Sequence, residues 1–322
     1  MASLSKISIM VPGKLHPHAM KRISETFSIV TIERGDASLI SPEIARAVEG
    51  IAAMTVIDAA LIDALPNLKI IANFGVGYDA VDARHAAARG VMVTNTPDVL
   101  TEEVADTAIG LLLNTLREFY QAEQWLRDGS WAEKGHYRFS RLTLRGRSVG
   151  ILGMGRIGQA IARRLVGFGV PVSYHNRRKV EGVSYQWHSS LLDMARAVDT
   201  IISVAPGGPS TDKIVGRQVF DALGSNGVFI NIGRGSTVDE DALVEALKNG
   251  VIAAAGLDVF DSEPKVRPGI LGAPNTSLLP HVGSASVATR EAMADLVVDN
   301  LVSWFREGRP ITPVPETASV KS

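Results

Sequence analysis

The sequence predicts an α/β protein with parallel sheets in about two domains. Short apolar runs typical of buried strands alternate with helical patterns along most of the chain, and this alternation favours parallel sheets. A Gly-x-Gly-x-x-Gly turn at 153–158 lies between an apolar run and a helical pattern. The length of 322 residues suggests about two domains, each large enough for its own core.

Composition and charge exclude several classes of function. Lys plus Arg is 33 and Asp plus Glu is 34, so the net charge of −1 indicates neither nucleic acid nor an anionic membrane as partner. The absence of cysteine excludes disulfides, thiolate metal sites and a cysteine nucleophile, and it fits a reducing compartment. No apolar run reaches the ~18 residues of a membrane span, and the first residues lack the apolar core of a signal peptide. We expect a cytoplasmic protein without a membrane partner.

Five short strands are expected ahead of the glycine-rich turn and should form a domain of their own. They cover 6–11, 27–32, 51–56, 69–74 and 91–94. Ser41 before Pro42 is typical of a helix start, and Gly90 closes an alanine-rich helix over 81–89.

Further strands are expected from the glycine-rich turn onward. They cover 148–152, 170–175, 200–204, 227–232, 253–259 and 276–279. Gly250 caps a helix over 239–249, and Gly308 and Pro310 end a long helix over 287–307, so 311–322 is interpreted as a tail.

Residues 101–128 are predicted to form one helix that is apolar nearly all round. Its apolar residues are Val104, Ala105, Ala108, Ile109, Leu111, Leu112, Leu113, Leu116 and Phe119. One apolar stripe would cover one partner, whereas this helix has two faces to bury. We expect it to pass between domains and to meet a second subunit. A core helix within one monomer is the alternative.

The glycine-rich turn predicts a dinucleotide site, because a strand precedes it and a helix follows it. Gly153 permits the tight turn, Gly155 lets the backbone approach a pyrophosphate, and Gly158 lets helix and strand pack closely. The N–H groups and dipole at the start of the helix favour phosphates. A purely structural strand, turn and helix is the alternative.

The end of the next strand favours NADP over NAD. About 20 residues beyond the glycines, where an NAD site carries Asp or Glu, the chain has Asn176, Arg177 and Arg178. A carboxylate there would repel a 2′-phosphate, whereas an amide and two guanidinium groups can donate to it. A basic surface turn is the alternative.

Arg234, Glu263 and His281 each follow a predicted strand. A cation, a carboxylate and an imidazole at strand exits could bind an anionic carbonyl compound and give it a proton. Taken singly, they would be a surface ion pair, a turn residue and a loop histidine. The other histidines lack metal-ligand spacing, so we expect no metal: His16, His18, His85, His136, His175 and His188.

Seven motifs stand in order along nearly the whole chain. They are Asn73-Phe74-Gly75-Val76-Gly77-Tyr78-Asp79, Val93-Thr94-Asn95-Thr96-Pro97-Asp98-Val99-Leu100, the glycine-rich turn, Asn231-Ile232-Gly233-Arg234-Gly235, Gly256-Leu257-Asp258-Val259-Phe260, Glu263-Pro264 and His281-Val282-Gly283-Ser284-Ala285. With them the chain resembles the D-2-hydroxyacid dehydrogenases, most closely the glyoxylate/hydroxypyruvate and hydroxyphenylpyruvate reductases.

The resemblance implies two doubly wound domains and a homodimer built around the cofactor domains. A flavodoxin-like substrate-binding domain would comprise 1–98 and 286–322, and a Rossmann-type NADP-binding domain would comprise 99–285, with the active site in the cleft between them. The implied reaction is NADPH-dependent reduction of small 2-oxoacids, namely glyoxylate, hydroxypyruvate and aryl-pyruvates, to D-2-hydroxy acids.

The resemblance also implies a role for each site residue. Val76 and Gly77 would offer N–H groups to the substrate carboxylate, and Arg234 would clamp the carboxylate and carbonyl oxygens. His281 would protonate the carbonyl oxygen, and Glu263 would orient its ring and favour the imidazolium. Met54 would lie near the substrate's side chain, although core packing explains it equally well.

The implied cofactor contacts extend over both halves of the glycine-bearing domain. They are Gly153, Met154, Gly155, Arg156, Ile157, Gly158, Asn176, Arg177, Arg178, Val204, Ala205, Pro206, Thr211, Ile232, Gly233, Arg234, Asp258, His281 and Gly283. Asp258 would anchor the nicotinamide end. The segment 205–211 departs from the family, because two glycines stand where many members have Pro-Leu-Thr, which suggests a looser loop.

Three alternatives to this function stay open. A sister dehydrogenase could act on another substrate such as phosphoglycerate, although no regulatory domain is present and 176–178 is basic. A formate dehydrogenase would pair its histidine with Gln, where Glu263 stands here. A nucleotide-sensing co-repressor would share the fold and the three site residues.

Three aromatic residues follow the predicted helix over 101–128. Trp131, Tyr137 and Phe139 would pack in the dimer or cover a neighbouring subunit's cleft.

Overall fold

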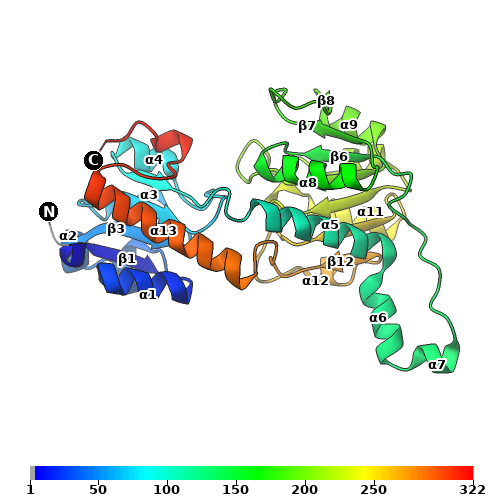
Figure 1. Cartoon of the computed structure of the whole chain (residues 1–322), viewed down its shortest axis with the longest axis horizontal. Helices are drawn as coiled ribbons and strands as arrows, with labels where there is room; N and C mark the ends of the chain where they lie inside the picture. The colour runs from blue at the N-terminus through cyan, green and yellow to red at the C-terminus, as the bar shows by residue number, and fades with distance from the viewer. Residues whose placement is uncertain (1–3, 322) are drawn as a thin grey trace. The chain divides into compact units, whose positions relative to one another are not determined.

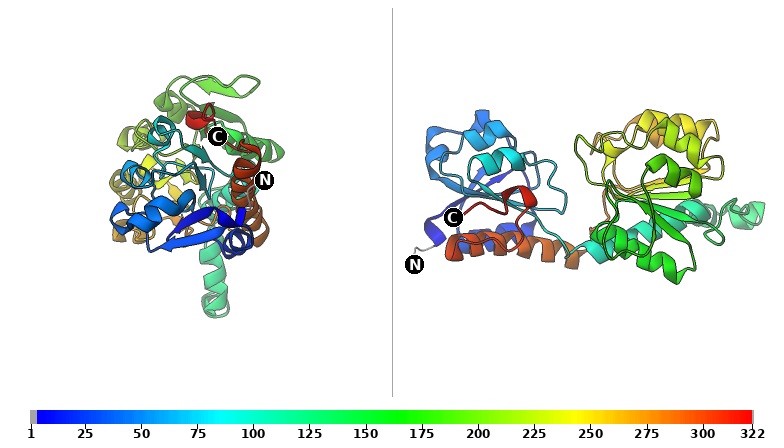
Figure 2. Two further views of the ribbon diagram at one scale, coloured as in Figure 1. Left: turned by 90° about the vertical axis from the view of Figure 1, so that its left-hand side faces the viewer. Right: turned by 90° about the horizontal axis from the view of Figure 1, so that it is seen from above.

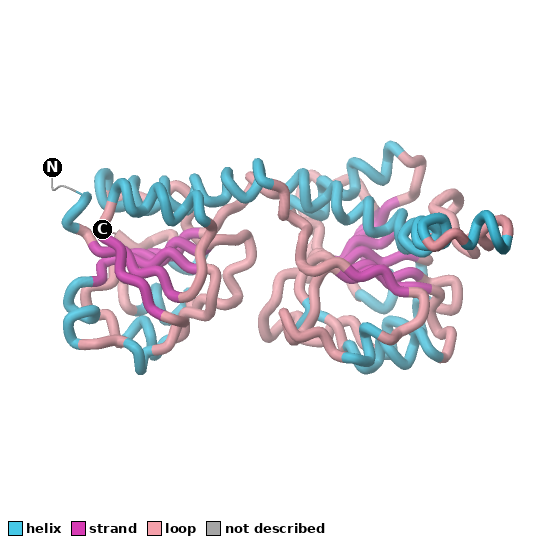
Figure 3. Tube along the Cα trace, turned by 90° about the horizontal axis from the view of Figure 1, so that it is seen from below, coloured by secondary structure: helices cyan, strands magenta, loops and turns pink. Residues whose placement is uncertain are grey.

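The computed structural model describes residues 4–321, which form two compact units (Figure 1). Unit 1 consists of Met1–Leu100 and Ala285–Ser322, and unit 2 consists of Thr101–Ser284. Each unit has one parallel sheet with helices on both faces (Figure 3). Among residues 4–321, no helix combines the length and the apolar character needed to cross a membrane. Each unit is therefore a doubly wound α/β layer structure.

The sheet of unit 1 has five parallel strands in the order β2-β1-β3-β4-β5, the flavodoxin-like order. They are β1 (Ser8–Pro12), β2 (Ser28–Ile32), β3 (Val48–Ala53), β4 (Ile70–Asn73) and β5 (Met92–Thr94). All five predicted strands are present. Strand β3 begins earlier than predicted because Val48, which is fully buried, already pairs with Ser8 of β1.

Both faces of this sheet are covered by helices. They are α1 (Pro17–Thr26), α2 (Pro42–Ala47), α3 (Ala59–Asp63), α4 (Ala83–Ala88) and α13 (Val287–Glu307). Helices α1 and α13 pack against each other (Figure 2), and Arg22 of α1 forms ion pairs with Asp295 and Asp299 of α13. The predicted cap of α2 is confirmed, since Ser41 Oγ accepts the Ile44 N–H at 3.2 Å.

The C-terminal segment is not a tail, so that interpretation is wrong. Val314 and Thr317 are buried, and Pro313 pairs with Thr94 of β5. Thr317 Oγ1 accepts the Val93 N–H at 3.1 Å and lies 3.1 Å from the Val93 carbonyl oxygen. The segment therefore covers the edge strand β5, whose backbone groups would otherwise lack partners.

The sheet of unit 2 has seven parallel strands in the order β12-β11-β10-β9-β6-β7-β8. They are β6 (Val149–Leu152), β7 (Val172–His175), β8 (Gln186–His188), β9 (Thr200–Ser203), β10 (Val228–Asn231), β11 (Ala254–Leu257) and β12 (Thr276–Leu278). The chain order reverses between β6 and β9, the place where Rossmann-type sheets bind ligands. The sequence did not predict β8, a three-residue edge strand without a fully buried side chain.

Eight α-helices lie in the described part of unit 2. They are α5 (Thr101–Arg117), α6 (Phe119–Arg127), α7 (Ser130–Lys134), α8 (Arg156–Gly167), α9 (Leu191–Ala197), α10 (Arg217–Leu223), α11 (Glu240–Lys248) and α12 (Pro268–Leu271). The single helix predicted over 101–128 is wrong in extent. Glu118 adopts a left-handed conformation with φ 55° and ψ 41°, which ends α5 and begins α6.

Most apolar residues of α5 are buried, and Leu113 is half-buried. A Cβ on Gly256 of β11 would lie 2.5 Å from Thr115 Oγ1 and 2.9 Å from Leu111 Cγ, so the helix packs directly on that strand. The core-helix alternative therefore describes α5. Beyond Glu118, helices α6 and α7 extend away from the sheet (Figure 1). Five apolar side chains on or beside these two helices are exposed: Phe119, Tyr120, Leu126, Trp131 and Phe139.

Candidate active site

In unit 2, the register of the sheet brings the predicted site loops to one edge. Asn231, Leu257 and Leu278 end β10, β11 and β12, and they pair across the sheet as Asn231 with Leu257 and Leu257 with Leu278. The loops that follow these strands carry Arg234, then Asp258 and Glu263, and then His281. Because parallel strands end at the same edge, the loops emerge side by side.

The structure joins His281 to Glu263 by a direct hydrogen bond. His281 Nδ1 lies 2.7 Å from Glu263 Oε2, and Glu263 Oε1 accepts the Phe260 N–H at 2.8 Å. Both carboxylate oxygens are thus engaged, which fixes the plane of the imidazole. The ring remains 47% exposed, so Nε2 is available to a reacting group. This is the arrangement of a general acid held by a carboxylate.

Glu263 is held in its ionised form. Burial by itself disfavours the charge, but the hydrogen bonds from His281 and the Phe260 N–H, with the charges of His281 and Arg234, outweigh it and lower the pKa of Glu263. The ionised carboxylate therefore stays in place as the hydrogen-bond partner of His281 Nδ1.

Asp258 holds the backbone around His281. Its carboxylate is buried, and its two oxygens accept the Val282 N–H at 2.7 Å and the Gly283 N–H at 2.9 Å. Its own carbonyl accepts the His281 N–H at 2.8 Å, while His281 has a left-handed φ of 54°. Burial raises the pKa of Asp258 against the effect of these hydrogen bonds. Both carboxylate oxygens of Asp258 thus bind the backbone of the turn that carries His281. A contact between Asp258 and the nicotinamide stays a prediction.

The turn that carries Arg234 is fastened from several sides. Asn231 Nδ2 and Thr237 Oγ1 both donate to the Arg234 carbonyl, at 2.9 and 2.7 Å. Arg234 Nη1 donates to the Gly233 carbonyl at 3.0 Å. A Cβ on Gly235 would lie 1.8 Å from the Phe260 carbonyl carbon, so this turn packs against the start of the Glu263 loop.

The sequence reasoning missed Glu240, which supports the Glu263 loop from α11. Its side chain is buried, and Oε1 accepts the Asp261 N–H at 2.8 Å. Oε2 has no hydrogen bond but lies 3.6 Å from Arg267 Nε. An acidic residue in the first turn of a helix is ordinarily explained by the helix dipole, so no sequence signal marked it as a support.

The three glycines of the glycine-rich turn have different surroundings. Gly153 has a φ of 103°, and a Cβ there would lie 3.0 Å from the Val204 carbonyl carbon. A Cβ on Gly158 would lie 2.1 Å from the Gly153 carbonyl oxygen, so helix α8 needs a glycine there. Around Gly155, which caps α8, no described residue other than its immediate chain neighbours has a heavy atom within 4 Å of such a Cβ. This leaves room for a phosphate next to the helix start.

The exits of β9 and β10 adjoin this turn. The Val204 N–H donates to the Leu152 carbonyl at 2.9 Å, and a Cβ on Gly233 would lie 2.6 Å from the Ala205 carbonyl oxygen. Beyond them Thr211 Oγ1 donates to the Pro206 carbonyl at 2.7 Å, which closes the glycine-containing loop. The side chains of Met154 and Ile232 are buried, so their backbones are what a ligand could reach; Arg156 and Ile157 begin α8.

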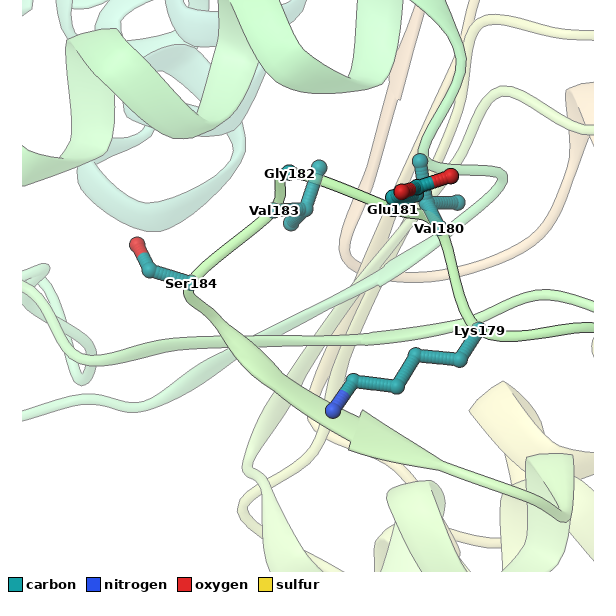
Figure 4. A pocket seen from close by; sticks show the side chains of 6 residues that line it. All are labelled: Lys179, Val180, Glu181, Gly182, Val183 and Ser184. Carbon is teal, nitrogen blue, oxygen red and sulfur yellow. The ribbon is translucent and has the colours of Figure 1, made fainter.

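The basic turn after β7 combines one engaged amide with exposed cations. Asn176 Oδ1 accepts the Met154 N–H at 2.6 Å, which ties this turn to the glycine-rich turn. Arg177 and Arg178 are exposed, and within residues 4–321 neither forms an ion pair or hydrogen bond. Lys179 extends the basic run into an open loop, where its side chain does not point toward that of Glu181 (Figure 4). The shallow hollow in that loop contains none of the predicted catalytic groups.

In unit 1, the loop after β4 carries two backbone N–H groups, those of Val76 and Gly77, that are available to a ligand. Asn73 Nδ2 donates to the Gly77 carbonyl at 3.0 Å, and Asn95 Nδ2 donates to the Val76 carbonyl at 2.8 Å. These bonds hold the carbonyls, while the N–H groups of Val76 and Gly77 have no acceptor among residues 4–321. Met54 follows β3 and is 48% exposed, so it is not a core residue.

Among the residues that the structure describes, no group of three or more His, Asp or Glu side chains is placed to hold a metal ion.

A family model matches residues 109–283, more than half of the chain, and describes the NAD-binding domain of D-isomer-specific 2-hydroxyacid dehydrogenases. The chain is 48% identical over 258 residues to hydroxyphenylpyruvate reductase of Plectranthus scutellarioides, covering 80% of this chain and 82% of that protein. It is 47% identical over 257 residues to glyoxylate/hydroxypyruvate reductase A of Arabidopsis thaliana, with the same coverage of 80% and 82%.

The structure is similar to that of an NADPH-dependent glyoxylate/hydroxypyruvate reductase from Sinorhizobium meliloti, crystallised with NADP and malonate. The TM-score is 0.95 and the sequence identity is 59%, with 98% of each chain covered. A 2-hydroxyacid dehydrogenase from Ketogulonicigenium vulgare is similar at a TM-score of 0.88 and 38% identity, covering 96% of this chain and 98% of that one.

Proposed function

The chain belongs to the D-isomer-specific 2-hydroxyacid dehydrogenase family, and from this premise we propose that it reduces small 2-oxoacids to D-2-hydroxy acids with NADPH. The substrates are glyoxylate, hydroxypyruvate and aryl-pyruvates, which the names of its relatives contain. The observation that carries the proposal is the 2.7 Å bond between His281 and Glu263, in loops that emerge beside that of Arg234.

The residues divide the work as follows. The N–H groups of Val76 and Gly77 bind the substrate carboxylate, and the guanidinium of Arg234 binds the carboxylate and the carbonyl oxygen. Bound NADPH supplies a hydride to the carbonyl carbon. The C–O π electrons move to oxygen, and His281 Nε2 gives its proton to that oxygen. Glu263 holds the ring at Nδ1, and in the reverse direction the neutral ring takes the proton back.

The same assignment distributes the ligands over the two units. Unit 1 contains the backbone donors and Met54, which we assign to the substrate, and unit 2 contains the glycine-rich turn and the basic turn, which we assign to the cofactor. The open space at Gly155 accepts the pyrophosphate at the start of α8. Arg177 and Arg178, which are exposed and form no ion pair within residues 4–321, donate to the 2′-phosphate that distinguishes NADPH from NADH.

The activity is tested with a panel of 2-oxoacids, each assayed with NADPH and with NADH. We expect turnover of glyoxylate and hydroxypyruvate. His281→Ala should lose kcat roughly 10²- to 10⁴-fold while NADPH still binds, because a general acid contributes about that much. Arg234→Ala should raise the substrate KM as well as lower kcat. A wild-type protein that binds NADPH but turns over none of these acids would instead favour a co-repressor.

The cofactor preference is tested by removing the two cations. Arg177→Gln with Arg178→Gln should raise the NADPH KM roughly tenfold or more, since a charge-assisted contact is lost at the phosphate, and should change the NADH KM little. Arg196→Gln is the control, because Arg196 is an exposed arginine near the end of α9. Equal or better kcat/KM with NADH in the wild type would reject the preference.

A further inference from the structure

His16 lies in the turn between β1 and α1, at the same sheet edge as the Val76–Gly77 donors. Strands β1, β3 and β4 are parallel neighbours, so the turns after them emerge together. The His16 ring stacks on that of Phe74, with centroids 6.0 Å apart and planes inclined by 19°. Phe74 immediately precedes Gly75 of the donor loop. His16 is thereby held beside the loop that binds the substrate carboxylate.

The hydrogen bonding of His16 determines which nitrogen carries the proton. Nδ1 accepts the His18 N–H at 3.3 Å as the N-cap of α1. A nitrogen that accepts a hydrogen bond has no proton, so the neutral ring carries its proton on Nε2. In the described part of the chain, no hydrogen bond uses Nε2. The ring is half-buried, and its remaining donor has no protein partner.

Neither the cap nor the stack explains why this residue is a histidine. Asn, Asp, Ser and Thr cap helices better than histidine does, and Phe or Tyr would stack on Phe74 equally well. Histidine combines a capping acceptor at Nδ1 with a donor at the far end of the ring. Position 16 thus supplies a hydrogen-bond donor at the substrate edge of unit 1.

We propose that His16 is a specificity-determining residue whose Nε2–H donates to an oxygen on C3 of the substrate, such as the hydroxyl of hydroxypyruvate. The inference rests on the proposed function and extends it to the substrate's side chain. With the carboxylate on Val76 and Gly77, the C3 group lies on the other side of the carbonyl carbon. Glyoxylate has no C3 and does not use this donor, so its turnover serves as the internal reference.

Two substitutions separate the two nitrogens of His16. In His16→Asn the amide oxygen takes the place of Nδ1 and keeps the cap, but no donor reaches the position of Nε2. In His16→Gln the longer amide places a donor near the position of Nε2. The measured quantity is kcat/KM for hydroxypyruvate divided by kcat/KM for glyoxylate, both with NADPH, together with the melting temperature of each variant.

We expect His16→Asn to lower this ratio about three- to tenfold, the range for one neutral hydrogen bond, with glyoxylate turnover changed less than about twofold. His16→Gln should keep most of the ratio. An unchanged ratio in His16→Asn, or an equal fall for both acids, would overturn the role of His16 while leaving the reductase activity standing. Failure of the wild type to reduce either acid would overturn the proposed function and this inference together.

Discussion

At the scale of single residues, the site separates the groups that touch a substrate from the groups that hold them. Glu263 fixes the imidazole of His281 from Nδ1, and Asp258 fixes the backbone on the far side of the same residue. The loss of one partner would leave a buried or half-buried polar group without its hydrogen bond. Because Glu263 is also the charged neighbour of the proton-donating ring, its removal should change the pH dependence of the reaction.

Glu263→Gln removes the charge and keeps the shape. Reduction needs the imidazolium, which the carboxylate favours, so the upper pH limit of 2-oxoacid reduction should move to lower pH in the variant. Oxidation of the hydroxy acid should be correspondingly favoured. The measurement is kcat/KM against pH in both directions. A pH profile identical to that of the wild type would show that the pairing is only structural.

The lowered pKa of Glu263 also predicts how the stability of the wild type changes in acid. Folding lowers the pKa of Glu263, so its ionised form stabilises the native state above the ordinary range of a glutamate. That contribution is lost as the pH falls toward the lowered pKa. Thermal melts between pH 6 and roughly pH 3 should therefore converge for the wild type and Glu263→Gln as the carboxyl becomes protonated.

At the scale of elements, the sequence predicted the long buried strands and the capped helices, because periodicity and cap residues are local signals. It missed β8 because three residues on an edge, none of them buried, give no such signal. It did not foresee the break at Glu118, where the apolar pattern continues through a left-handed residue. The docking of Thr317 on Val93 depends on residues more than two hundred positions apart, which no local pattern encodes.

The candidate site shows the same limit. The residue types of the His281, Glu263 and Arg234 loops were predictable from their motifs, and the structure places His281 against Glu263. The supporting contacts of Glu240 and Gly235 were not, since each acts on a loop reached only through the fold.

The glycine-rich turn offers a matched pair of substitutions. Gly158→Ala should lower stability by about 1–3 kcal/mol, because its Cβ would overlap the Gly153 carbonyl oxygen at 2.1 Å. Gly155→Ala has open space and should melt like the wild type, yet bind NADPH more weakly if the pyrophosphate lies there. Melting curves with calorimetric titration of NADPH distinguish the two effects. Normal NADPH affinity in Gly155→Ala would remove the pyrophosphate from that position.

At the scale of the whole molecule, the exposed apolar side chains on and beside α6 and α7 need a partner, and we propose a second copy of the chain. Exposed aromatic groups at this density are typical of an interface. Light scattering should give a dimer for the wild type and a monomer for the double variant Trp131→Ser with Phe139→Ser. Leu271→Ser, which removes an exposed apolar side chain from α12, should remain dimeric. A stable, active wild-type monomer at micromolar concentration would contradict the proposal.

The path of the chain through its two units has a consequence for how such enzymes can be recombined. Unit 2 is one uninterrupted stretch, and near its two ends Thr107 Oγ1 donates to the Gly283 carbonyl at 3.2 Å. An insert whose ends meet can be exchanged as a single cassette without reordering its host. Cofactor preference can therefore be exchanged between related enzymes by one crossover at each end of residues 101–284. An exchange of substrate preference requires two distant segments to be inherited together, which makes it the harder trait to acquire by recombination.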